Sequence, residues 1–213
     1  MRSATAQSLV QDTLEQPSKL LGWLLPEPED CEHLTVLHVG PALQDTLDFF
    51  SQYRCQLHVR DLFAELPLPD SEEPDKVEAA LAESLQLPED ARFDLCLFWD
   101  WFSYLDKTSL VTFLRLLQPH LHRHTRGHAF GVHNLRSRPV QNLYGIRSLD
   151  SLSARMRAGS LPGYTPHSQR ELKELLYCLD VERSVLLPDS RLELLLRTVE
   201  PDAATQRFRQ LGL

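Results

Sequence analysis

The chain has 213 residues, of which 42% are hydrophobic and 24% are charged, so it is long enough to bury a substantial core and does not have a disordered composition. Its formal net charge of −8 disfavours binding of nucleic acid by the surface as a whole. No stretch approaches the roughly 20 apolar residues of a membrane-spanning helix, and the N-terminus lacks the pattern of a secretory signal. We therefore expect a cytoplasmic protein with one main domain and no membrane partner.

The predicted elements begin with an N-terminal helical extension over residues 1–30, whose amphipathic pattern is interrupted at Pro17. Strand and helix periodicities then alternate along the chain. The predicted strands cover residues 34–39, 56–60, 93–98 and 127–133, and the predicted helices cover residues 42–53, 75–87, 109–122 and 168–179. Residues 183–187 and 192–198 form two strands around a turn, and residues 201–213 a short tail helix.

This order of elements predicts the fold class. Alternating strands and helices require right-handed crossovers, which build a parallel sheet covered on both faces. The C-terminal hairpin adds one antiparallel strand. We therefore expect an α/β fold with a Rossmann-like, mostly parallel sheet, helices on both faces and a C-terminal antiparallel β-hairpin strand. This domain covers residues 31–200.

Three segments of the predicted sheet carry recognisable motifs. Val36-Leu-His-Val-Gly40 is an apolar strand that ends in a glycine turn, and Leu57-His-Val-Arg-Asp61 is a strand that ends in an acid. Residues 93–105 form an apolar strand that continues into an aromatic run. Together they resemble the first, second and fourth strands of the class I S-adenosylmethionine-dependent methyltransferase superfamily. The resemblance implies S-adenosylmethionine as the cofactor, bound near His38, Gly40 and Asp61, with Asp61 on the ribose.

The glycine loop departs from the family pattern. His38 stands where the family commonly has an acid, and Ala42 and Gln44 stand at its second and third glycine positions. Glycine is used there because the backbone must approach the ligand closely, and Pro41 also removes an amide donor. Between the second and fourth strands the chain has only a proline-rich loop and one helix, so we expect the family's third strand to be absent. The chain is thus similar to a divergent member with a degenerate motif.

An aromatic run at the carboxyl end of the strand at 93–98 predicts a pocket. Trp99, Asp100, Trp101 and Tyr104 would line its mouth, with Asp100 as the polar group. Aromatic walls suit a planar or cationic ligand, including a sulfonium. The alternative is that these rings form a hydrophobic lid and contact no ligand, since neighbouring side chains of a strand point in opposite directions.

The segment from Pro119 to Arg157 is rich in arginine, with seven arginines and a single acid. Arginine favours planar, bidentate contact with phosphate or carboxylate groups. By analogy with the family, residues 134–166 would cover the substrate site or bind a partner. The candidate anion-binding or partner-binding residues are Arg136, Arg138 and Arg147. The alternative is that these arginines pair with carboxylates of the chain itself.

Five histidines between residues 120 and 133 raise the question of a metal site. His120 and His124 are four residues apart and could share one face of a helix. No acid or cysteine accompanies them, and polar groups are common at a hydrated helix end. We therefore predict no metal site.

Two functions remain open. The first is S-adenosylmethionine-dependent methyl transfer to an unknown small molecule or protein. The second is a catalytically inactive binding module that docks an acidic partner protein through the arginine-rich segment. A dinucleotide-dependent enzyme is disfavoured, because the first turn contains a single glycine.

Overall fold

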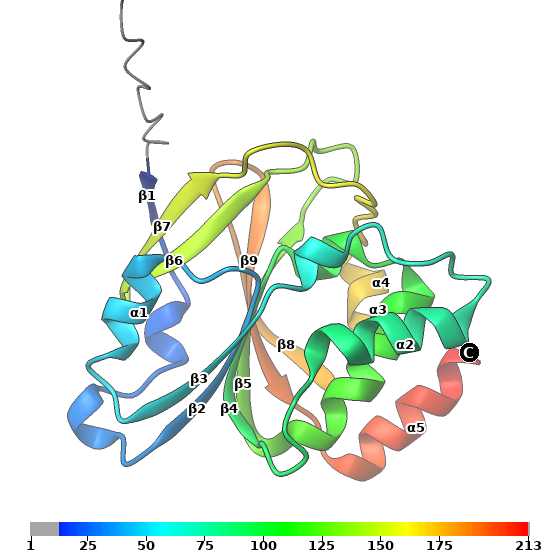
Figure 1. The fold of residues 1–213 in the computed structure, drawn as a ribbon, viewed down its shortest axis with the longest axis horizontal. Helices are drawn as coiled ribbons and strands as arrows, with labels where there is room; N and C mark the ends of the chain where they lie inside the picture. The colour runs from blue at the N-terminus through cyan, green and yellow to red at the C-terminus, as the bar shows by residue number, and fades with distance from the viewer. Residues whose placement is uncertain (1–12, 213) are drawn as a thin grey trace, which may run out of the picture.

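The computed structural model describes residues 13–212, and a six-stranded sheet forms its centre (Figure 1). The strands are β2 (Leu34–Val39), β3 (Cys55–Arg60), β4 (Phe93–Trp99), β5 (Leu121–Val132), β8 (Leu179–Leu186) and β9 (Arg191–Thr198). Their order in the sheet is β3-β2-β4-β5-β9-β8. Strand β9 runs antiparallel to both of its neighbours, and the other adjacent pairs are parallel. The predicted mostly parallel sheet with a C-terminal antiparallel strand is confirmed.

The missing third strand is also confirmed for the described part of the chain, where β3 forms the edge of the sheet. From β3 the chain passes through a proline-containing loop and helix α2 (Pro74–Leu85) directly into β4. The prolines explain this path, because proline cannot donate a hydrogen bond to a sheet ladder.

Four helices cover one face of the sheet, namely α2, α3 (Lys107–Leu117), α4 (Gln169–Leu175) and α5 (Pro201–Leu211) (Figure 1). Their apolar stripes bury the larger core cluster, in which Leu81, Leu110 and Leu172 are all at most 5% exposed. Asp106 and Ser168 cap α3 and α4 by accepting hydrogen bonds from backbone amides three residues further on. These caps define the residue at which each helix begins.

The other face carries α1 (Gln44–Phe50) and a small antiparallel sheet, ordered β1-β7-β6 (Figure 1). Its strands are β1 (Thr13–Pro17), β6 (Asn142–Ser148) and β7 (Ser151–Met156). The β6–β7 hairpin lies within the candidate cover segment 134–166, where the sequence has only weak periodicity. Helices therefore lie on both faces, as predicted, but strands complete the second face.

The predicted helical extension over residues 1–30 is wrong where the structure describes it, from residue 13 onward. Residues 13–17 form strand β1, and only short 3-10 turns follow at Leu21–Trp23 and Pro28–Asp30. The reason is long-range pairing, because β1 forms its ladder with β7, from Thr13 opposite Arg155 to Pro17 opposite Ser151. Local periodicity carries no signal of such a partner. Residues 1–12 lie outside the described residues.

Glu193 on β9 anchors this N-terminal segment to the main sheet. Its buried carboxylate accepts hydrogen bonds from the Ser18 hydroxyl, from the Lys19 amide at 2.8 Å and from His128 Nε2 at 3.0 Å. Burial by itself raises the pKa of Glu193, but the hydrogen bonds of its carboxylate and the electrostatic interaction with the His128 ring outweigh the effect of burial, so the pKa is lowered. The carboxylate is therefore ionised and fully bonded within the core.

Gly145 on β6 lies close both to Ser153, its cross-strand partner on β7, and to the chain at the start of α1. A β-carbon at this position would lie 2.5 Å from Ser153 Oγ and 3.1 Å from the β-carbon of Leu43. We expect Gly145→Ala to lower the free energy of unfolding by about 1–3 kcal/mol, because both the Ser153 side chain and the chain at Leu43 must shift to make room for the added methyl group. Urea unfolding measures this change. The control is Gly22→Ala, which meets no atom closer than 3.7 Å and should stay within about 0.5 kcal/mol of the wild type. A Gly145 variant as stable as the wild type would contradict the close contact.

Candidate functional site

The crevice at the carboxyl ends of β2 and β3 is where the sequence places a cofactor. The parallel register sets Val39 opposite Arg60, so the residues that follow, Gly40 and Asp61, are neighbours. The Gly40 amide donates a hydrogen bond to the Arg60 carbonyl at 2.6 Å, and Gly40 has a φ of +102°, which favours glycine. Ligands of open α/β sheets commonly bind at such an edge. The structure thus brings two of the three predicted cofactor residues together, and their role stays a prediction.

The chain's own side chains fill this crevice. A β-carbon at Gly40 would lie 3.3 Å from two carbons of the Phe63 ring and 3.8 Å from a guanidinium nitrogen of Arg157. The Arg157 guanidinium carbon lies 4.4 Å from the centre of the Phe63 ring, a cation–π contact. The same ring packs edge-on against Trp101 and Tyr104, at centroid distances of 5.1 and 5.7 Å. The Phe63 ring therefore occupies the space that the missing side chain of Gly40 leaves open.

Arg157 reaches the crevice from the end of β7, where its amide donates to the Gln141 carbonyl at 2.9 Å. Burial lowers the pKa of its guanidinium, and the charges of Asp61 and Asp100 act in the opposite direction. An arginine remains charged in spite of such a shift. A cation therefore stands over an aromatic ring, in the field of the two carboxylates expected to bind ligands.

S-adenosylmethionine does not fit this crevice as folded. The Gly40 cradle is in contact with Phe63, the next residue Pro41 has no amide to offer, and Arg157 lies near Asp61, the predicted ribose ligand. Binding the cofactor would require the Phe63 ring and the Arg157 side chain to move away together.

His38, at the position of the family's usual acid, faces the core instead of the crevice. The Trp99 indole N–H donates to His38 Nε2 at 3.2 Å, so the proton must be on Nδ1, which donates to the Gly40 carbonyl at 3.1 Å. Burial lowers the pKa of His38 to about 4. His38 is therefore a neutral residue that supports the turn at Gly40, and it is not placed to bind a ligand.

The predicted pocket residues divide between the two faces of the sheet. Trp99 has a φ of +51° and stacks on Tyr144 at 5.4 Å, on the face of the small sheet. Trp101 belongs to the core on the helical face. Asp100 and Tyr104 line a small cavity of about 20 Å³, which is large enough for about one water molecule. Both tryptophan rings therefore pack within a core, and the pocket role of this aromatic run stays a prediction.

Asp100 lies in a buried polar cluster that the sequence does not reveal. Arg191 lies 3.7 Å from its carboxylate, pairs with Asp189 at 2.7 Å and donates a hydrogen bond to the Tyr144 hydroxyl. Burial raises the pKa of Asp100 to about 6, although the charge of Arg191 opposes this shift. The cluster joins β9, β6 and the end of β4, which no local pattern places side by side.

The three predicted anion-binding arginines differ in their surroundings. Arg147 is paired with Glu15 at 3.5 Å and lies 3.9 Å from Asp45, as the alternative of self-pairing predicts. Arg136 and Arg138 lie exposed on the loop after β5, and neither forms an ion pair with any residue between 13 and 212. Of the three predicted arginines, Arg136 and Arg138 are therefore the two without an ion pair in the described part of the chain.

The histidine run does not lie on one helix. The expected helix over 109–122 is wrong at its end, because α3 stops at Leu117 and Pro119 prevents its continuation, so β5 begins at Leu121. His124 lies on β5, whereas His120 bonds the Ala91 carbonyl at 3.0 Å. Among the described residues no group of three or more potential metal ligands comes together, and no helix is long and apolar enough to cross a membrane.

The order of the strands and the antiparallel β9 decide the fold assignment. The fold is class I methyltransferase-like. No family model matches the sequence, and no curated protein matches it. Solved structures are similar only remotely, and the chain spans about half the length of PhzM and of MmcR, two of these structures.

The pyocyanin biosynthetic protein PhzM is 16% identical, with 84% of this chain and 53% of that chain covered and a TM-score of 0.44. The mitomycin 7-O-methyltransferase MmcR is 17% identical, with coverage of 84% and 52% and a TM-score of 0.47. The methyltransferase CcbJ from Streptomyces caelestis is 12% identical, with coverage of 78% and 89% and a TM-score of 0.47. Likeness at this level says nothing of the activity of this chain.

The neutral His38 makes stability depend on pH. Its pKa is about 4 in the folded protein and 6.5 without the fold, so the unfolded chain binds more protons between these values and stability falls as the pH drops through this window. The full shift corresponds to about 3 kcal/mol. We expect the free energy of unfolding, measured with urea, to fall less in His38→Gln than in the wild type between pH 7 and about pH 4.5. The reason is that the unfolded variant has no imidazole at position 38 to bind a proton.

The matched control is His33→Gln, at an exposed position, which should follow the wild-type pH profile. Asp100 contributes to the pH dependence of stability with the opposite sign, since its raised pKa favours folding at low pH. This contribution cancels in the comparison because all three proteins contain Asp100. Identical losses in the wild type and His38→Gln would contradict a buried neutral His38.

Proposed function

We propose that this protein is a binding module built on the methyltransferase-like fold, and not an S-adenosylmethionine-dependent enzyme. One observation carries this proposal: Phe63 and Arg157 occupy the space beside Gly40 that a cofactor would need. Phe63 is held in turn by Trp101 and Tyr104, so emptying the crevice breaks several packed contacts at once. A ligand that binds only a rarely populated open state loses affinity in proportion to that population.

The partner that suits this module is an acidic protein surface. Arg136 and Arg138 supply two unpaired guanidinium groups on an exposed loop, and Leu135 between them and β5 is 51% exposed. Arginine is enriched among the residues that dominate binding at protein interfaces. The negative net charge of the remaining surface would direct such a partner to this loop.

Methyl transfer with S-adenosylmethionine remains the second candidate, on one specific observation. The Arg157 cation lies over the Phe63 ring and interacts with the charges of Asp61 and Asp100. The same surroundings would favour a sulfonium cation if Arg157 moved out. Gly40, Asp61 and Asp100 would then stand around an open crevice, and Asp61 would accept hydrogen bonds from the ribose.

The cofactor test is a thermal shift experiment. We expect no rise in melting temperature with S-adenosylmethionine or S-adenosylhomocysteine at about 1 mM, because the closed crevice offers the ligand no site. A rise that grows with concentration, is lost in Asp61→Ala and is kept in the exposed control Asp90→Ala would contradict the binding-module proposal. It would support the second candidate. In Arg157→Ala a shift that the wild type lacks would identify Arg157 as the group that closes the site.

The partner surface is tested by charge reversal. The probe is a fluorescein-labelled oligoglutamate peptide, and its binding is measured by fluorescence anisotropy at low and high salt. We expect the double variant Arg136→Glu/Arg138→Glu to bind at least about tenfold more weakly, and salt to weaken wild-type binding. Arg209→Glu, an exposed reversal on α5, should change affinity by less than about twofold. Equal binding by the wild type and the double variant would exclude this loop as the acidic-partner site.

A further inference from the structure

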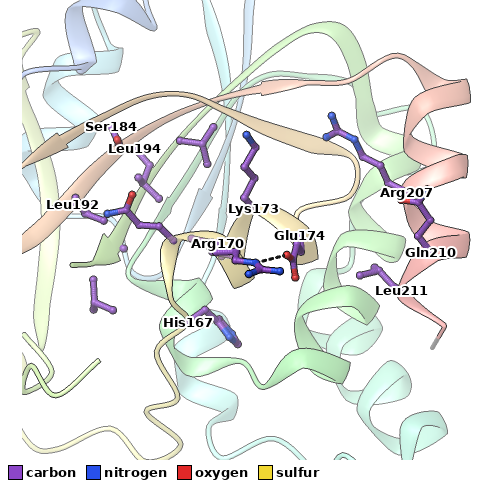
Figure 2. A pocket seen from close by; sticks show the side chains of 15 residues that line it. His167, Arg170, Lys173, Glu174, Ser184, Leu192, Leu194, Arg207, Gln210 and Leu211 are labelled. Carbon is purple, nitrogen blue, oxygen red and sulfur yellow. Dashed lines mark hydrogen bonds and ion pairs between the residues drawn. The ribbon is translucent and has the colours of Figure 1, made fainter. Parts of the chain in front are cut away.

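A groove of about 850 Å³ lies on the helical side of the sheet, between α4, α5 and the strand pair β8–β9 (Figure 2). Its volume is within the range of small-molecule sites, about 300–1,000 Å³. Gly40, Asp61 and Phe63 do not line it, so it is separate from the crevice. The proposed function leaves this groove unexplained.

The groove lies where helix α4, which has seven residues, leaves the strands behind it uncovered. Helix α4 ends at Leu175 and α5 begins only at Pro201, after β9. Ser184 on β8 pairs with Leu194 on β9 and is exposed. Leu186 pairs with Leu192 and is 56% exposed. The helical face of β8 is therefore open where a longer helix would have buried it.

The floor of the groove is apolar. Leu172 from α4 and Leu192 and Leu194 from β9 form it, and each is at most 5% exposed. Val181 from β8 and Leu211 from α5 extend it at the sides. A hydrocarbon chain lying on this floor would be removed from water along its length, which is favourable in proportion to the buried area.

The rim carries three cations, but only one of them is unpaired. Arg170 pairs with Glu174 at 3.0 Å, and Arg207 pairs with Asp180 at 2.8 Å. Lys173 forms no ion pair with any residue in the described range and extends from α4 toward the strands, as Figure 2 shows. An uncompensated ammonium group above an apolar floor attracts an anion at short range.

We propose that this groove binds a medium-chain fatty carboxylate, with its hydrocarbon chain on the leucine floor and its carboxylate at Lys173. The charges stand on the rim and the floor is apolar, so the groove suits a ligand with one charged end. A peptide would need hydrogen-bond partners for its amides along its whole length, and amides left unpaired on an apolar floor are costly. One ammonium group matches one carboxylate as a point charge, whereas bidentate phosphate binding favours arginine.

The test is a fluorescence titration of the full chain with 11-(dansylamino)undecanoic acid. We expect a saturable rise in fluorescence that dodecanoate reverses. Dodecanol, which lacks the charge, and acetate, which lacks the chain, should reverse it much less at the same concentration. Lys173→Glu should weaken binding about tenfold, because attraction becomes repulsion. Lys76→Glu, on the exposed side of α2, is the matched control and should have less than about a twofold effect.

A second variant separates loss of the site from loss of the fold. Ser184→Trp introduces a large side chain at an exposed position of the groove and should abolish the fluorescence rise while the melting temperature is retained. Absence of saturable binding, binding unchanged in both variants, or equal displacement by dodecanol would each overturn the proposal. A dimer, seen by light scattering, that Ser184→Trp dissociates would likewise overturn it and assign the groove to a second copy of the chain. These outcomes do not depend on the cofactor test.

Discussion

The buried carboxylate of Glu193 is the interaction on which the two layers of this protein depend. It lies on β9 in the main sheet and accepts hydrogen bonds from Ser18 and Lys19, directly after β1. Strand β1 pairs with β7, and β7 ends at the residue before Arg157. A single ionised group in the core thus anchors the small sheet to the main sheet. Arg157, which directly follows β7 of this small sheet, reaches the crevice with its guanidinium. Removing one partner of such a buried group is costly, since the remaining polar atoms lose their hydrogen bonds.

The fold and the cofactor site are physically separable in this chain. The parallel strands and their crossovers need only apolar strands and amphipathic helices, which the sequence supplies in the order of the methyltransferase-like fold. A cofactor site needs more, because the backbone at the first turn must be open to a ligand. Here Gly40 is retained with its positive φ, but Phe63 packs beside it and the neutral His38 ring donates a hydrogen bond to its carbonyl. Open space is found instead beside β8, where α4 is short.

The core strands of the main sheet could be predicted closely from sequence. The patterns at 34–39, 56–60 and 93–98 match β2, β3 and β4 to within a residue. β2 and β4 are nearly continuous apolar runs, which is typical of strands buried on both faces. The edge strand β3 instead alternates apolar and polar residues. Strands β1, β6 and β7 could not be predicted in this way. β1 is stabilised by pairing with β7, more than a hundred residues away, and β6 is stabilised by pairing with β7 in a hairpin. The start of β5 was not predicted, because His122, Arg123 and His124 are polar, partly or fully exposed residues that give no apolar strand pattern.

The sequence by itself determined the class of fold, the absence of a third strand in the described part and the positions of Gly40, Asp61 and Asp100 at the carboxyl ends of their strands. These follow from local periodicity and from the geometry of parallel sheets. Only the tertiary structure decided that Arg147 is paired while Arg136 and Arg138 are not, and that Trp99 and Trp101 face opposite cores. It also decided what lies against Gly40. Phe63 follows β3 and Arg157 follows β7, and their meeting depends on how two sheets pack, which no local pattern of residues encodes.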